Sequence, residues 1–118
     1  MAARKRVICD SVALTEGGAG VRFTVSRDGT DQAAFAVRFD GAVHAYLNRC
    51  AHVPVEMDWM EGSFFDHSGL YIVCSTHGAA YLPDTGFCIA GPCKGRRLVP
   101  VQVDESDGQI WLIDADKT

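Results

Sequence analysis

Two pairs of cysteine and histidine residues in this sequence have the close spacing of metal ligands. Cys50 and His52 form the first pair, in NRCAHVP, and Cys74 and His77 form the second, in YIVCSTHGAAY. The intervening segment, 53–73, is 21 residues long. Each pair directly follows an apolar run of the β type and enters a turn, so two loops can converge on one point. We therefore expect two thiolates and two imidazoles around a shared centre.

Two thiolates and two imidazoles are compatible with more than one kind of centre. Tetrahedral zinc accepts this donor set, and so does an iron–sulfur cluster. Zinc sites usually pair Cys with Cys and His with His at short spacing, whereas each loop here supplies one of each. That distribution favours two irons, one bound by both thiolates and the other by both imidazoles. A structural zinc domain is the alternative, and its expected spacing fits less well.

Short β-type runs on both sides of these motifs indicate the elements that must position them. The pattern predicts strands at 6–9, 21–27, 34–39, 43–48, 70–74, 98–103 and 109–113. Asp40-Gly41 predicts a type I′ hairpin turn, and DESDG, residues 104–108, predicts a turn-rich connection. Pro100 inside its run indicates an edge strand or a strand entry. The pattern favours an all-β sandwich or barrel.

Length and composition predict one domain. The chain has 118 residues, of which 47% are apolar and 22% charged, as in ordinary globular proteins. We expect a single domain over residues 1–118. Residues 49–93 are richer in Gly, Pro, Cys and His and poorer in strand pattern, so we expect them to form a subdomain that carries the site.

Charge, hydropathy and cysteine count exclude several classes of function. The net charge of -4 weighs against nucleic-acid binding. No apolar run approaches the roughly 20 residues of a transmembrane helix, and the start does not resemble a signal peptide, so no membrane contact and a cytoplasmic location are expected. Five cysteines, an odd number, argue against a disulfide framework. Cys9 is expected in the core. Cys88 and Cys93 are expected as free thiols because the cytosol is reducing, with a regulatory disulfide between them as the alternative.

The paired motif, Cys-x-His followed by Cys-x-x-His with a glycine directly after it, resembles the Rieske [2Fe–2S] domain. The segment CSTHGAAYLPDTGFCIAGPCKGRRLVPVQV is similar to the second cluster loop, the DTG turn and the Gly-Pro loop of that family. Most of the chain is covered by the resemblance. It implies an all-β fold, a Rieske-like antiparallel β-sandwich with a small cluster-binding subdomain of loops and short strands.

The resemblance also implies a set of site residues and one [2Fe–2S] cluster as cofactor. Cys50 and Cys74 would bind one iron, and His52 and His77 the other. Further cofactor-binding positions that it implies are Gly78, Tyr81, Gly91 and Pro92, the last two as a third loop over the cluster.

Three positions depart from the high-potential members of the family. Val55 and Thr76 replace the extra loop cysteines that those members join as a disulfide, and Ala79 replaces a serine that donates to a cluster sulfur. Fewer donors leave the reduced cluster less stabilised. We expect a potential of roughly -150 to +50 mV, in the low part of a family span of about -150 to +300 mV.

The resemblance implies an electron carrier rather than a catalytic subunit. The chain is similar to ferredoxins that serve bacterial aromatic-ring dioxygenases, which implies a flavin-dependent reductase as donor and a terminal oxygenase as acceptor. The alternative is a small subunit of an assimilatory nitrite reductase or of another Rieske-containing oxidoreductase. The sequence alone identifies neither the partners nor the oligomeric state.

The sequence allows two interpretations for each of two segments. Trp59, Phe64 and Phe65 are either an exposed docking patch or core cover over the cluster loops. KGRR, residues 94–97, is expected to be a solvated turn, with contact to an acidic partner as the alternative.

Overall fold

Antiparallel strands make up most of the chain that the structure, a computed structural model, describes: residues 3–27, 29–49, 62–66, 68–74, 78–91 and 95–115. The strands are β1 (Ala3–Asp10), β2 (Val21–Arg27), β3 (Thr30–Phe39), β4 (Ala42–Leu47), β5 (Ile72–Val73), β6 (Ala80–Tyr81), β7 (Cys88–Ala90), β8 (Val103–Ser106) and β9 (Gln109–Ala115). One 3-10 turn, η1 (Ser11–Ala13), follows β1. In these ranges no helix is long and apolar enough to cross a membrane.

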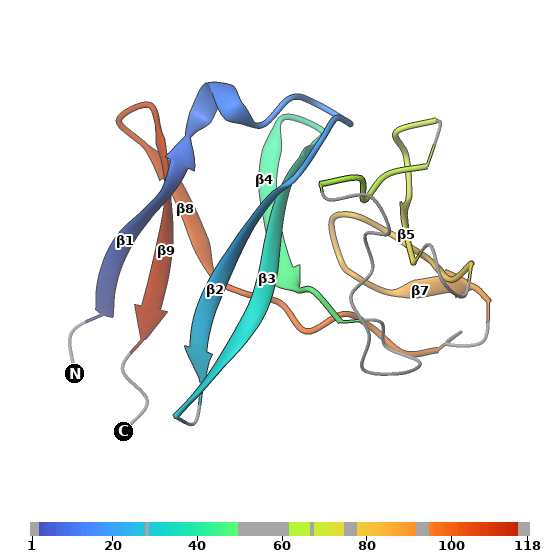
Figure 1. Ribbon diagram of the computed structural model, residues 1–118. Helices are drawn as coiled ribbons and strands as arrows, with labels where there is room; N and C mark the ends of the chain where they lie inside the picture. The colour runs from blue at the N-terminus through green and yellow to red at the C-terminus, as the bar shows by residue number, and fades with distance from the viewer. Residues whose placement is uncertain are drawn as a thin grey trace.

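The strands form three antiparallel sheets of three strands each, in the orders β1-β9-β8, β2-β3-β4 and β5-β6-β7. Figure 1 shows the first two sheets next to each other and the small third sheet on the far side of β4. The expectation of an all-β antiparallel fold is confirmed.

Strand β3 is buried on both faces and separates two hydrophobic cores. Its small residues Ala34 and Ala36 face a core shared with the first sheet, which includes Ile110 and Leu112. Phe35 belongs to the other core, which lies beneath the third sheet. Successive side chains of a strand point to opposite faces, so an uninterrupted apolar run suits a strand between two cores.

Two tight turns join neighbouring strands. Asp40 and Gly41 have φ values of 53° and 79°, so the predicted type I′ turn between β3 and β4 is confirmed. Asp107 and Gly108 have φ values of 54° and 73° and join β8 to β9 in the same way. The prediction of a turn over all of 104–108 was too broad, because the strand continues to Ser106.

The predicted strand 98–103 is mostly irregular. Pro100 makes only an isolated bridge with Tyr46, and β8 begins at Val103. Leu47 donates its N–H to the Val99 carbonyl, and Val101 donates to that of Ala45, so this segment still lies along β4. A proline has no N–H to contribute to a continuous ladder. Pro100 therefore precedes a strand, as one of its two interpretations expected.

Candidate functional site

One of the four predicted ligands, Cys74, lies within the described residues. It directly follows β5 and is fully buried, in the core that also contains Ile72 and Tyr81. Cys50, His52 and His77 lie outside the described residues, as does Pro92. The complete ligand set therefore remains a prediction.

The backbone on each side of the second Cys–His pair is closed by hydrogen bonds. Cys74 N–H donates to the Ala79 carbonyl at 2.9 Å, and Gly78 N–H donates to the Cys74 carbonyl at 2.8 Å. Strands β5 and β6 continue this pairing, with Ile72 opposite Tyr81. The chain therefore leaves a short strand at Cys74 and returns beside it at Gly78.

Gly91 brings a second predicted loop against the first. Its φ of 96° is one that residues with a Cβ rarely adopt. A Cβ at this position would lie 2.8 Å from the Ala79 Cα and 3.3 Å from the Gly78 carbonyl oxygen. The chain after β7 thus touches the backbone that follows the Cys74 loop, and only a glycine allows this approach.

Tyr81 lies in the middle of the third sheet. It is fully buried on β6, opposite Ile72 of β5 and Cys88 of β7. The structure thus brings the predicted residues Cys74, Gly78, Tyr81 and Gly91 together in and around one small sheet. Cys74 lies where a strand ends and a loop begins, and Gly91 brings a second loop against the first. This arrangement fits a cofactor held between the two loops.

Phe64 and Phe65, before β5, are core residues rather than an exposed docking patch. Phe64 is fully buried and stacks on Phe35 with the ring centroids 4.0 Å apart. Phe65 is partly buried and packs against the same core. Trp59 lies outside the described residues.

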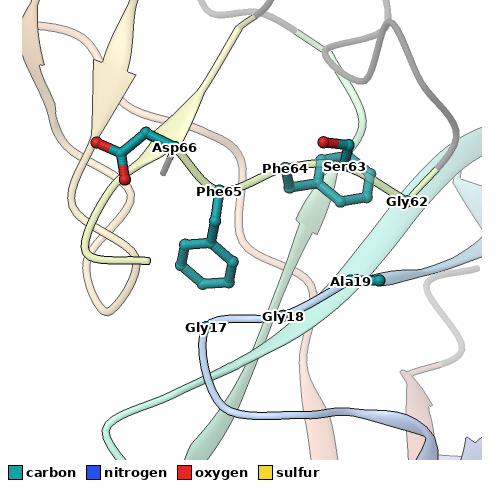
Figure 2. Close-up of a pocket in the computed structure, with 8 residues that line it drawn as sticks. All are labelled: Gly17, Gly18, Ala19, Gly62, Ser63, Phe64, Phe65 and Asp66. Carbon is teal, nitrogen blue, oxygen red and sulfur yellow. The ribbon is translucent and has the colours of Figure 1, made fainter. Parts of the chain in front are cut away.

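A surface cavity of about 260 Å³ adjoins these aromatic residues (Figure 2). Its lining includes the backbone of Gly17 and Gly18 and the rings of Phe64 and Phe65, but no predicted ligand. Asp66 also lines it, and its carboxylate accepts a hydrogen bond from Ser68 Oγ at 2.7 Å, which lowers the pKa of Asp66. The Asp66 carboxylate is already hydrogen-bonded within its own turn, and no predicted ligand lines the cavity. The cavity is therefore not the candidate site.

Two cysteines outside the predicted ligand set have different states. Cys88 is disulfide-bonded, which corrects the expectation of a free thiol at this position. Neither Cys9 nor Cys74 forms a disulfide, so the partner of Cys88 is not among the described cysteines. Cys9 is half-buried against the core between the first two sheets, and burial raises the pKa of its thiol.

Tyr46, which the sequence analysis did not single out, connects the second sheet to the candidate site region. Its hydroxyl donates to the Pro83 carbonyl at 2.8 Å, and a Cβ at Gly86 would lie 2.9 Å from its ring. Burial, with a smaller contribution from the charge of Asp84, raises the pKa of Tyr46 to about 12. These contacts join residues far apart in sequence, and no local pattern signals them.

The raised pKa of Tyr46 predicts a loss of stability in alkali. The folded state holds the phenol neutral above its ordinary pKa of about 10, so this stabilisation is complete below that pH. It should be lost as pH rises from about 10 to about 12. Urea unfolding across this range should show a smaller loss for Tyr46→Phe than for the wild type. Equal losses in the two proteins would contradict this role of Tyr46.

Comparison with known proteins places this arrangement in a family. The family model described as the Rieske [2Fe-2S] domain matches residues 5–106. The chain belongs to this family. A Rieske domain binds one [2Fe–2S] cluster, so the cofactor expected from the sequence is confirmed.

Solved structures similar to this Rieske protein include ferredoxins and oxygenases. The Sphingomonas yanoikuyae B1 ferredoxin is 24% identical, with a TM-score of 0.71 over 96% of this chain and 100% of that one. A carbazole 1,9a-dioxygenase ferredoxin from Nocardioides aromaticivorans IC177 is 21% identical, with a TM-score of 0.69 over 93% and 97%. A terminal oxygenase from Novosphingobium sp. KA1 is 23% identical, with a TM-score of 0.70 over 98% of this chain but 31% of its own. Comparison with curated proteins found no match.

Proposed function

We propose that this Rieske protein is a cytoplasmic ferredoxin of low potential that passes single electrons from a flavin-dependent reductase to a terminal oxygenase. The observation that carries the proposal is the similarity of this chain's fold to ferredoxins over nearly their full length. One of these is a chain in a complex of reduced oxygenase and oxidised ferredoxin in carbazole 1,9a-dioxygenase, with a TM-score of 0.71 and 21% identity over 97% of this chain. Membership of the Rieske family supplies the redox cofactor.

Cys50 and Cys74 would hold one iron and His52 and His77 the other. The cluster supplies a reversible one-electron couple when bound. Burial of Cys74 keeps water away from its sulfur, and the Gly78 and Gly91 contacts hold two loops together around that position. We further propose that residues 49–93 act as the cluster-binding subdomain of a single domain, because β5, β6 and β7 form a sheet that shares no strand with the other two sheets of the described residues.

Ala79 provides a test of the proposed low potential. It is fully buried next to Gly91, and its methyl group cannot donate a hydrogen bond. Ala79→Ser would supply a hydroxyl, which stabilises the reduced and more negative state. We expect the midpoint potential to rise by roughly 60 mV, a tenfold change for a one-electron couple. An unchanged potential in a fully loaded variant would show that residue 79 does not reach the cluster.

The carrier role is tested by anaerobic stopped-flow mixing. The oxidised protein is mixed with a flavin reductase and reduced nicotinamide cofactor, and the visible absorbance of the cluster is followed. Reduction within seconds, followed by reoxidation when a terminal oxygenase is added, is expected. If chemical reductants reduce the cluster but no flavin reductase does, the proposed donor is wrong.

A further inference from the structure

One surface next to the candidate site combines exposed apolar side chains with a fixed positive charge. The chain around β7 pairs with residues 96–98 as well as with β6: Cys88 N–H donates to the Arg96 carbonyl, and Leu98 N–H donates to the Gly86 carbonyl. Phe87 and Arg97 lie directly opposite each other in this ladder. Directly opposite residues present their side chains on the same face.

Side chains alternate between exposed and buried positions along residues 87–89 and 97–99. Cys88 and Leu98 are buried at 5% and 1% exposure. Their neighbours point outward, so that Phe87 is 46% exposed, Ile89 40% and Val99 41%. We call the outward set of Phe87, Ile89, Arg97 and Val99 the β7 face. Ile89 and Val99 lie on either side of the Phe87–Arg97 pair along this face, and three large exposed apolar side chains on one face favour a surface that binds another molecule.

Arg97 fixes a positive charge on this surface. Its guanidinium lies 5.0 Å from the centre of the Phe87 ring, and Nη2 donates to the Thr85 carbonyl at 3.1 Å. Arg96 is exposed beside it. The chain as a whole carries a net charge of -4, so the β7 face is a local basic site on an acidic protein. An arginine held over an aromatic ring keeps donors for a carboxylate.

The β7 face is also continuous with the loops of the site. Ile89 lies two residues before Gly91, where an added Cβ would meet the backbone of Gly78 and Ala79 after Cys74. A molecule seated on the β7 face would therefore lie next to the loop that carries Cys74.

We propose that the β7 face docks the flavin-dependent reductase that donates the electron, through an apolar patch on that reductase bordered by carboxylates. This inference rests on the proposed carrier function and assigns its docking surface. The apolar side chains supply contact area, and Arg97 sets the orientation by pairing with an acidic group.

The test measures the second-order rate constant for reduction by the flavin reductase, at several ionic strengths. Phe87→Ser combined with Ile89→Ser should lower this constant at least tenfold. Arg97→Glu should lower it at least tenfold at low salt and flatten its salt dependence, because attraction becomes repulsion. The controls are Val12→Ser, at a 90% exposed position on η1, and Lys5→Glu, a charge reversal on β1; both should stay within twofold of the wild type.

The possible outcomes separate the two proposals. An unchanged midpoint potential and cluster content in every variant shows that the site itself is intact. Variant rate constants equal to that of the wild type would overturn the docking surface while leaving the carrier role. If no flavin reductase reduces the wild-type protein, the proposed carrier role with that donor is wrong. The docking surface, which rests on that role, is then wrong as well. If sedimentation shows a dimer that Phe87→Ser dissociates, a second copy occupies the face and the proposal is wrong.

Discussion

Cys74→Ser should yield a colourless protein that has lost its cluster. The structure places Cys74 directly after β5, fully buried and with its backbone tied to Ala79, so a serine at this position would lie where the thiol lies. A serine hydroxyl is a poor ligand for iron compared with a thiolate. Iron and acid-labile sulfide should fall at least tenfold, together with the visible absorption bands.

Cys9→Ser is the matched control for that substitution. Cys9, like Cys74, forms no disulfide, but it lies on β1 and packs against the core that does not contain Cys74. Its replacement should leave iron, sulfide and colour at the level of the wild type. Full cluster content in Cys74→Ser, or an equal loss in Cys9→Ser, would contradict the assignment of Cys74 as a ligand.

Gly91→Ala should separate the two loops that meet beside Cys74. The added Cβ would lie 2.8 Å from the Ala79 Cα, closer than carbon atoms approach without a shift of the backbone. The residue would also have to adopt a φ of 96°. Overpacking costs about 1–3 kcal/mol and the unfavourable backbone conformation about 1–3 kcal/mol. We expect a loss of roughly 2–6 kcal/mol in the free energy of unfolding and several-fold faster loss of iron to a chelator.

Gly95→Ala separates the effect of the contact from that of the backbone conformation. Gly95 has a φ of 93°, close to that of Gly91, but a Cβ there would meet nothing within 4 Å. This variant should lose stability only through its backbone conformation, by about 1–3 kcal/mol, and should keep its iron as long as the wild type. Equal iron release from the two variants would show that the contact between Gly91 and Ala79 does not hold the site together.

The longer strands could be predicted from the sequence because their signals are local. VRFTVSR became β2 with the predicted bounds, and the Asp40-Gly41 pair became the turn between β3 and β4. The strands of the third sheet were harder to predict. β6 and β7 have only two and three residues, too few to show a period, and they are stabilised by pairing with each other and with β5.

The sequence predicted which residues belong to the candidate site but not how they are arranged in space. The resemblance singled out Gly78 and Gly91, but their contact depends on the pairing of β6 with β7, which no local pattern encodes. Tyr46 was missed for a similar reason, because its partners Pro83 and Gly86 lie far along the chain. The state of Cys88 was predicted wrongly from the assumed reducing environment, since its bond depends on which cysteine the fold brings beside it.

Electron paramagnetic resonance during a potentiometric titration of the purified protein tests the central claim most directly. The account predicts no signal in the oxidised protein. On reduction, a rhombic signal should appear with an average g below that of the free electron and a midpoint in the low part of the Rieske range. A protein that carries its full metal content and shows no such signal at any potential would contradict the account, and its ligands would then hold zinc.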